Sequence, residues 1–233
     1  MFDFQEEKDK IDFQQTKMQW GEYYDIAFKN MKAHEKYSNR VLIEIAAQHP
    51  LKNGKNPDVS FAKRLDKGIS LYQELRANGK DCKIYVPGSI HNGDIVSLSR
   101  AGKEYLVASG KVAETDVFDE TINDFVKNGE GVYNSADECL VASKLFLEGQ
   151  YGNLICVCSA NQLLRKKLFY IRFGVVPDIW AVPDDSFHSD IGEIFDAIPF
   201  VLFKDHDWQS KESEQAIRTR KERKPGYIKP NGK

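Results

Sequence analysis

Residues 131–175 read GVYNSADECLVASKLFLEGQYGNLICVCSANQLLRKKLFYIRFGV. An apolar run at 154–158 separates two segments in which apolar residues recur at helical spacing, and a polar turn follows the run. The pattern predicts a helix, a buried strand, a polar turn and a second, basic helix. Such an alternation is typical of an α/β fold.

Similar runs elsewhere predict further strands. Short segments rich in β-branched and aromatic residues occur at 40–46, 83–86 and 179–182, and 115–119 is a candidate for another short strand. Helix-period segments separate these runs, which indicates βαβ crossovers. We therefore expect a three-layer, Rossmann-like α/β fold with a mostly parallel sheet.

The helices between these strands carry start and stop signals. Ser60 is placed to cap one helix, and Asn78-Gly79 supplies its end. A second helix is predicted at 94–109.

The chain of 233 residues fits one α/β domain with an extension at each end. Residues 1–39 have apolar residues at spacings that suit one or two amphipathic helices, so they form a predicted N-terminal helical extension. Residues 40–203 are the predicted α/β domain. Residues 204–233 are polar and basic with few aliphatic residues, and we assign no function to this tail.

Charge and apolar content exclude several classes of protein. The 33 Lys and Arg residues nearly balance the 35 Asp and Glu residues, and a net charge of −2 gives no field that attracts nucleic acid or an anionic membrane. No apolar run approaches the roughly 18 residues of a membrane-spanning helix, and residues 1–13 lack a secretory signal. We therefore expect a cytoplasmic protein without a membrane anchor.

The four cysteines predict reduced thiols. Cys156 and Cys158 alternate within one strand, where they share a face but lie too far apart for an easy disulfide. The sequence has no CxxC motif and no histidine close to these thiols, so no metal site is expected.

Three polar turns lie at 87–94, 131–138 and 159–167. The first and third follow predicted strands, and the second begins a predicted helix. In an open parallel sheet, ligands bind beyond the carboxyl ends of the strands, where the first amides of each helix attract anions. Because the three turns converge on one edge, the sequence predicts a site for an anionic small molecule there. The residues expected to contact it are Gly88, Ser89, Asn134, Ser135, Ser159, Asn161, Gln162 and Arg165.

Each feature also has a structural interpretation. Taken alone, Ser135 and Glu138 fit a capping box, which the pattern favours over a ligand contact. Arg165 could share a solvated helix face with its two neighbouring lysines, His91 could be an ordinary loop histidine, and Gly88 could serve only a turn. Three such turns at equivalent ends of one sheet exceed what capping requires, and this favours a ligand site.

The segments NSADEC and SANQLLRK resemble two motifs of the bacterial SanA/YdcF/ElyC-like domain, a family of largely unknown function. The first resembles the family's Asn-Thr-x-Glu-Asn-Ala helix start, and the second its Thr/Ser turn with a His-x-x-Arg helix start. Gly88 and Ser89 match part of a Ser-Gly-Gly turn. The resemblance covers roughly residues 40–185 and implies that Arg64 is a further ligand-binding residue.

The chain also departs from the family pattern. Gln162 stands where the family usually has histidine, and a glutamine exchanges no proton near neutral pH. Chemistry that needs this histidine should be absent. Many family members are membrane-anchored, whereas no anchor is expected here.

Two classes of function remain open. In the first, an enzyme acts on a nucleotide-like, phosphorylated or sugar-linked small molecule, Arg64 and Arg165 bind its anionic groups, and Glu138 or His91 is the acid–base group. In the second, a non-catalytic protein binds or senses a nucleotide-derived ligand such as S-adenosylmethionine. The sequence indicates no particular cofactor, and the absence of GxGxxG argues against a dinucleotide dehydrogenase.

Overall fold

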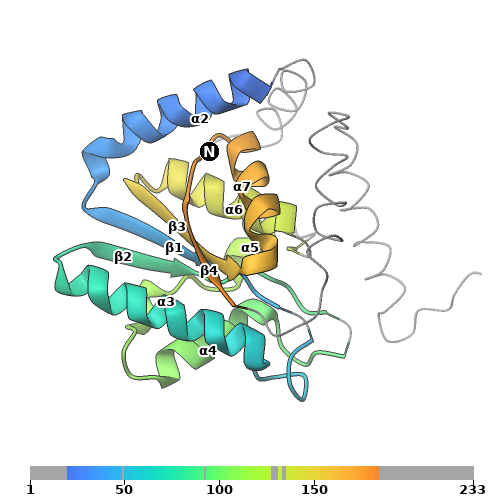
Figure 1. Cartoon of the computed structure of the whole chain (residues 1–233). Helices are drawn as coiled ribbons and strands as arrows, with labels where there is room; N and C mark the ends of the chain where they lie inside the picture. The colour runs from blue at the N-terminus through green and yellow to red at the C-terminus, as the bar shows by residue number, and fades with distance from the viewer. Residues whose placement is uncertain (1–19, 49, 92, 127–130, 133–134, 184–233) are drawn as a thin grey trace, which may run out of the picture.

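The computed structural model describes residues 20–48, 50–91, 93–126, 131–132 and 135–183. At its centre lies a four-stranded parallel sheet in the order β2-β1-β3-β4 (Figure 1). The strands are β1 (Arg40–Ile45), β2 (Asp81–Tyr85), β3 (Asn153–Ser159) and β4 (Asp178–Val182). The four predicted core strands and the parallel α/β fold are therefore confirmed, with strand ends within two residues of those expected.

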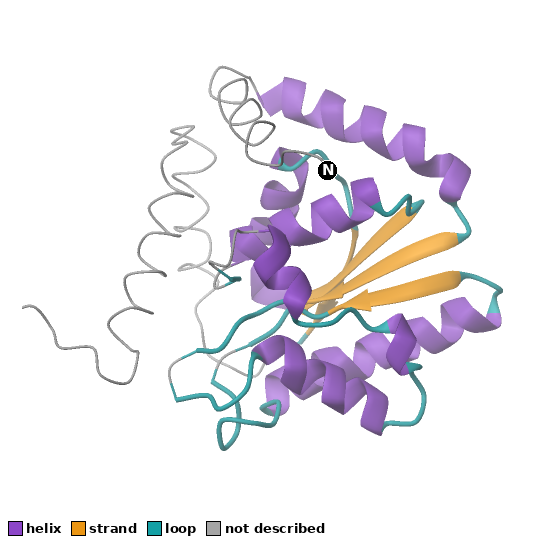
Figure 2. Ribbon diagram, turned by 180° about the vertical axis from the view of Figure 1, so that it is seen from behind, coloured by secondary structure: helices purple, strands orange, loops and turns teal. Residues whose placement is uncertain are grey.

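Helices cover both faces of the sheet and complete the three layers (Figure 2). One face carries α3 (Val59–Ala77) and α4 (Leu98–Ala108), and the other carries α2 (Trp20–His34), α6 (Ser135–Glu148) and α7 (Leu163–Arg172). The shorter elements are α5 (Thr121–Val126) and the 3-10 turns η1 (Glu35–Tyr37), η2 (Glu114–Asp116) and η3 (Ala160–Gln162).

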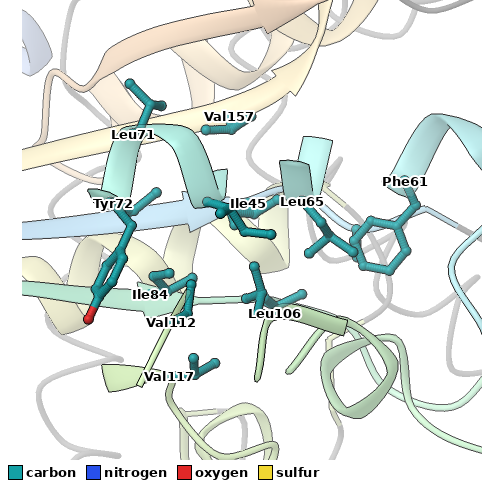
Figure 3. Packing of buried hydrophobic residues seen from close by; sticks show 14 of the residues in the cluster. Ile45, Phe61, Leu65, Leu71, Tyr72, Ile84, Leu106, Val112, Val117 and Val157 are labelled. Carbon is teal, nitrogen blue, oxygen red and sulfur yellow. The ribbon is translucent and has the colours of Figure 1, made fainter. Parts of the chain in front are cut away.

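The core between the sheet and α3 is apolar. Figure 3 shows Ile45 of the sheet beside Leu65 of α3, with Phe61 next to Leu65, and these side chains belong to one buried cluster that also contains Val157. Leu65 and Phe61 lie four residues apart, on the same face of the helix. This packing fixes α3 against the sheet and so fixes the loop that joins β1 to α3.

The side chains of β1 alternate between the two faces. Val41, Ile43 and Ile45 belong to the cluster under α3 and α4, whereas Leu42 belongs to the cluster under α6 and α7. Because alternate residues of a strand share a face, Glu44 points to the same side as Leu42. This carboxylate is fully buried, so its partners must come from within the protein.

Two local predictions are wrong. The side chain that caps α3 is that of Asp58, whose Oδ1 accepts from the Phe61 amide at 2.7 Å, rather than that of Ser60, which lies inside the helix. The segment 115–119 forms no strand, because η2 occupies its start and only an isolated parallel bridge joins Val117 to Ile84. This bridge lies against β2, the strand at one end of the sheet order.

Of two other predicted boundaries, the end of α3 agrees with the structure and the start of α4 differs from it. Helix α3 ends at Asn78 and Gly79, and Gly79 has the positive φ of 75° that suits a glycine. Helix α4 begins four residues later than the 94–109 prediction, because Ser97 is its N-cap and accepts from the Arg100 amide at 2.9 Å.

The predicted N-terminal extension is helical in its described part, where α2 contacts α7. Asn30 of α2 donates to the carbonyl of Gly174 at 2.9 Å, just beyond the end of α7. Residues 1–19 and the predicted tail at 204–233 lie outside the described residues.

Candidate functional site at the carboxyl edge of the sheet

The loops that follow β1, β2 and β3 lie at one edge, because the carboxyl ends of parallel strands meet there. The loop after β2 is bound to the segment before α6: the Ser89 amide donates to the Val132 carbonyl at 2.9 Å, and the Val132 amide donates to Ser89 Oγ at 2.9 Å. The same loop is bound to the one after β1, since the Leu51 amide donates to Asp94 Oδ1 at 3.0 Å. These contacts join two of the three predicted polar turns, 87–94 and 131–138, and bind the first of them to the loop after β1.

Gly88 serves the turn after β2. Its φ is 111°, and a Cβ atom there would lie 2.8 Å from the Leu98 side chain at the start of α4. Its carbonyl accepts from the Ser99 amide at 3.0 Å. The structural interpretation of Gly88 thus has a clear basis: α4 packs against the turn where a side chain would stand.

Replacing Gly88 with alanine should lower the free energy of unfolding by about 1–3 kcal/mol, because the substitution adds backbone strain and a contact with Leu98. Gly93→Ala is the matched control in the same loop: its φ is 84°, but nothing lies within 4 Å of the added Cβ. Denaturant unfolding of both variants measures the difference, and equal losses would show that the Leu98 contact is unimportant.

A buried ion network lies beneath this edge. Lys166 Nζ donates to Glu44 Oε1 at 2.6 Å and to Glu138 Oε2 at 2.5 Å, and the Tyr170 hydroxyl donates to Glu44 Oε2 at 2.7 Å. The side chains of Lys166 and Glu44 are 0% exposed and that of Glu138 is 11% exposed. Charged side chains are almost never buried to this extent unless they are paired.

Three elements position this network. Glu44 points from β1 toward α7, where Lys166 and Tyr170 lie four residues apart on one helix face. Glu138 extends from the first turn of α6, and the Cys139 thiol beside it donates to the Lys166 carbonyl at 3.9 Å. The network therefore joins β1, α6 and α7 near the carboxyl edge of the sheet.

The sequence interpretation missed this network. The alternative interpretation in which Arg165 shares a solvated helix face with Lys166 and Lys167 is wrong for Lys166, because Lys166 is fully buried. The sequence interpretation also favoured a capping box for Ser135 and Glu138, which is wrong because Glu138 binds Lys166 and Ser135 Oγ accepts from Arg165. The signal that could have revealed the network is Glu44, a single acidic residue within the apolar run RVLIEI.

Burial and neighbouring charges shift the pKa values of Lys166 and Glu138. Burial alone would lower the pKa of Lys166, but the acidic groups of Cys139, Glu138 and Glu44 outweigh it and raise this pKa well above its ordinary value. Burial raises the pKa of Glu138, and the charge of Glu44 adds to this effect, although Lys166 opposes it. The raised pKa favours the charged ammonium form of Lys166.

Arg64 binds the loop that follows β1. Its side chain is fully buried, and Nη1 donates to the carbonyls of Ala46 at 2.8 Å and Ala47 at 3.1 Å, while Nη2 donates to Gln48. These contacts make Arg64 a support of the carboxyl edge. They identify no ligand contact for this residue.

Two amides follow β3 at the start of α7. Asn161 Oδ1 and Gln162 Oε1 are both buried atoms, and neither has a hydrogen-bond partner in the described part of the chain. Ser159, the last residue of β3, precedes these two residues in the sequence and is buried. One turn into the helix, Arg165 Nη2 donates to Ser135 Oγ at 3.1 Å, which joins the α6 and α7 starts.

The remaining predicted residues are less well placed. The His91 carbonyl accepts from the Asp94 amide at 3.1 Å and so helps to close the loop after β2. Asn134 lies outside the described residues. The structure therefore binds Ser89 to Val132 and Arg165 to Ser135 at this edge, and Glu138 follows Ser135 by three residues in the first turn of α6.

Comparison of the chain with protein-family models, with curated proteins and with solved structures found no match. Among the described residues, no group of three or more His, Cys, Asp or Glu side chains is arranged to hold a metal ion. None of the helices in the described ranges is both long and apolar enough to cross a membrane.

Proposed function

We propose that the chain is a SanA/YdcF/ElyC-like protein that binds a nucleotide-like, phosphorylated or sugar-linked small molecule at the carboxyl edge of its sheet and acts on it. The observation that carries this proposal is the pair of buried oxygens, Asn161 Oδ1 and Gln162 Oε1, without partners among the described residues. Buried polar atoms in folded proteins nearly always have a partner, and an exception calls for a ligand or a water molecule.

The chemistry of the neighbouring groups supports this ligand class. Two amide oxygens accept hydrogen bonds, and the ligand groups that donate them are hydroxyls of a sugar or amino groups of a base. Arg165, three residues after Gln162, supplies a guanidinium, which suits phosphate or carboxylate. The combination of hydroxyl or amino donors with an anionic group is found in nucleotides and in sugar phosphates.

Binding without chemistry is a second candidate, and one observation favours it. Neither Asn161 nor Gln162, the residues with unpartnered oxygens, exchanges a proton near neutral pH. A sensor or carrier for a nucleotide-derived ligand such as S-adenosylmethionine needs only such neutral contacts.

A thermal-shift screen tests the proposed class with four probes: AMP, UDP-glucose, S-adenosylmethionine and inorganic phosphate. A probe that binds only the folded protein raises its melting temperature. We expect AMP or UDP-glucose to do so. Stabilisation by S-adenosylmethionine alone would support the second candidate, and no shift with any probe would argue against the ligand class.

Arg165→Ala should weaken the binding of a phosphate-bearing probe by about 1.5–3 kcal/mol, the usual range for a hydrogen bond to a charged group. Arg165→Lys should restore only part of the affinity, because lysine lacks the planar, two-pronged contact. Titration calorimetry with AMP or UDP-glucose, whichever gives the larger thermal shift, measures both effects.

Lys167→Ala is the matched control, because Lys167 is exposed on the same helix two residues later. Its affinity should equal that of the wild type. If Arg165→Ala is folded and also binds with unchanged affinity, Arg165 does not contact the ligand.

A further inference from the structure

Glu138 is the outward end of the buried ion network. Its side chain is 11% exposed, whereas those of Lys166 and Glu44 are 0% exposed. Lys166 binds its Oε2 atom, which leaves Oε1 to carry a proton or to meet a ligand. Within the network, Glu138 is therefore the carboxyl group with access to a bound molecule.

The balance of charges within the network indicates that Glu138 also carries a proton. A single ammonium, that of Lys166, lies between the carboxyl groups of Glu44 and Glu138. Glu44 has a second donor, the Tyr170 hydroxyl, so its negative charge is the better stabilised of the two. Two buried carboxylates bound to one ammonium do not both remain charged at low cost, and the proton goes to the one with fewer hydrogen-bond donors.

Glu138 also lies within one helical turn of the anion-binding end of the proposed site. Ser135 precedes it by three residues on α6, a spacing at which side chains are neighbours on one helix face. Arg165 binds Ser135, and the next residue, Lys166, binds Glu138. A phosphate held by Arg165 at this place would lie at the same end of α6 as Glu138.

Other titratable groups surround the network on every side. Burial raises the pKa of Tyr85 on β2, of Tyr170 on α7, and of Cys139 and Cys156, so these groups stay neutral. A hydrogen bond from Cys156 lowers the pKa of Cys158 on β3. The charged groups that act on Glu138 are Lys166 of α7, Glu44 of β1 and Arg64 of α3.

We infer that Glu138 is the proton-exchanging group of this site: its carboxyl passes the O–H proton to an oxygen of a bound phosphorylated or sugar-linked ligand, and Lys166 neutralises the carboxylate that remains. The proton leaves Glu138 Oε1 and joins a lone pair of the ligand oxygen. The ligand part of this inference rests on the proposed function, whereas the proton on Glu138 is a property of the protein alone.

Carbon NMR of protein labelled at the glutamate carboxyl carbon tests the proton without a ligand. The signal that disappears in Glu138→Gln should titrate above the ordinary glutamate value of about 4.3. Glu148→Gln, at the exposed end of the same helix, is the matched control and should leave that signal in place. Titration of the Glu138 signal at or below the ordinary value would overturn the inference.

The pH dependence of the unfolding free energy is a second test, because a raised and a lowered pKa of Glu138 predict changes of opposite sign. Because the folded pKa of Glu138 is raised, its stabilising contribution is complete below the unfolded value and is lost as the pH rises through the folded value. The wild type and Glu148→Gln should therefore lose stability relative to Glu138→Gln as the pH rises through that window. A relative gain with rising pH would contradict a proton on Glu138.

Calorimetry with AMP in two buffers of different ionisation enthalpy tests the transfer to a ligand. Wild-type binding should release or take up protons, and Glu138→Gln should lose this change while it still binds. AMP binding without any proton change in the wild type would overturn the transfer. Failure of AMP to bind any variant counts against the proposed ligand class, and the NMR titration then decides the inference.

Discussion

Replacing Lys166 with methionine should lower the free energy of unfolding by about 3–5 kcal/mol, the usual cost of removing one partner from a buried ion pair. Glu44 would keep the Tyr170 hydroxyl but lose its cation, and Glu138 would lose the cation at Oε2. Methionine fills a similar volume, so little of the loss should come from a cavity. Denaturant unfolding at neutral pH measures the change.

The control for this variant is Lys167→Met, which changes an exposed neighbour by the same substitution and should stay within about 0.5 kcal/mol of the wild type. Lowering the pH should reduce the difference in unfolding free energy between Lys166→Met and the wild type, because protonated carboxyl groups carry no charge for the cation to neutralise. If Lys166→Met is as stable as Lys167→Met at neutral pH, the buried network contributes nothing to the fold.

Arg64→Met should cost at least about 2 kcal/mol, since two buried carbonyls lose their donor and each unsatisfied group costs roughly 1–3 kcal/mol. The affected carbonyls belong to Ala46 and Ala47, at 2.8 and 3.1 Å from Nη1. Arg64→Lys should lose less, because an ammonium reaches some of these acceptors but not the whole set that a guanidinium binds.

Arg76→Met is the matched control on the same helix. Arg76 is 46% exposed at its side chain and pairs with Asp81 at 3.8 Å, and surface pairs of this kind contribute less than about 1 kcal/mol. Equal unfolding free energies for Arg64→Met and Arg76→Met would refute a supporting role for Arg64.

The strands could be predicted because each one is specified by a short run of consecutive residues. The run RVLIEI and the run around Cys156 are short, β-branched or apolar, and bounded by turn residues. Their parallel pairing then follows from the helices between them. The common edge of the polar turns is a consequence of that topology, so it too could be expected from the sequence.

The buried network could not be predicted in the same way. Glu44 and Lys166 are 122 residues apart, and nothing local distinguishes Lys166 from its exposed neighbour Lys167. The Ser-x-x-Glu pattern at Ser135 and Glu138 indicates a capping box wherever no distant cation competes for the glutamate. Here Lys166 is that cation, and only the packing of α7 beside α6 reveals it.

The order β2-β1-β3-β4 has a consequence for the nascent chain. As synthesis proceeds from the N-terminus, β1 can pair with β2 early, but its other edge waits for β3. Until then the second edge of β1 has no strand to pair with, and the carboxylate of Glu44 on one face of the strand has no cation. Pairing across so long a separation slows folding, so the interval before Lys166 is synthesised is when the chain is most exposed to aggregation and to chaperones.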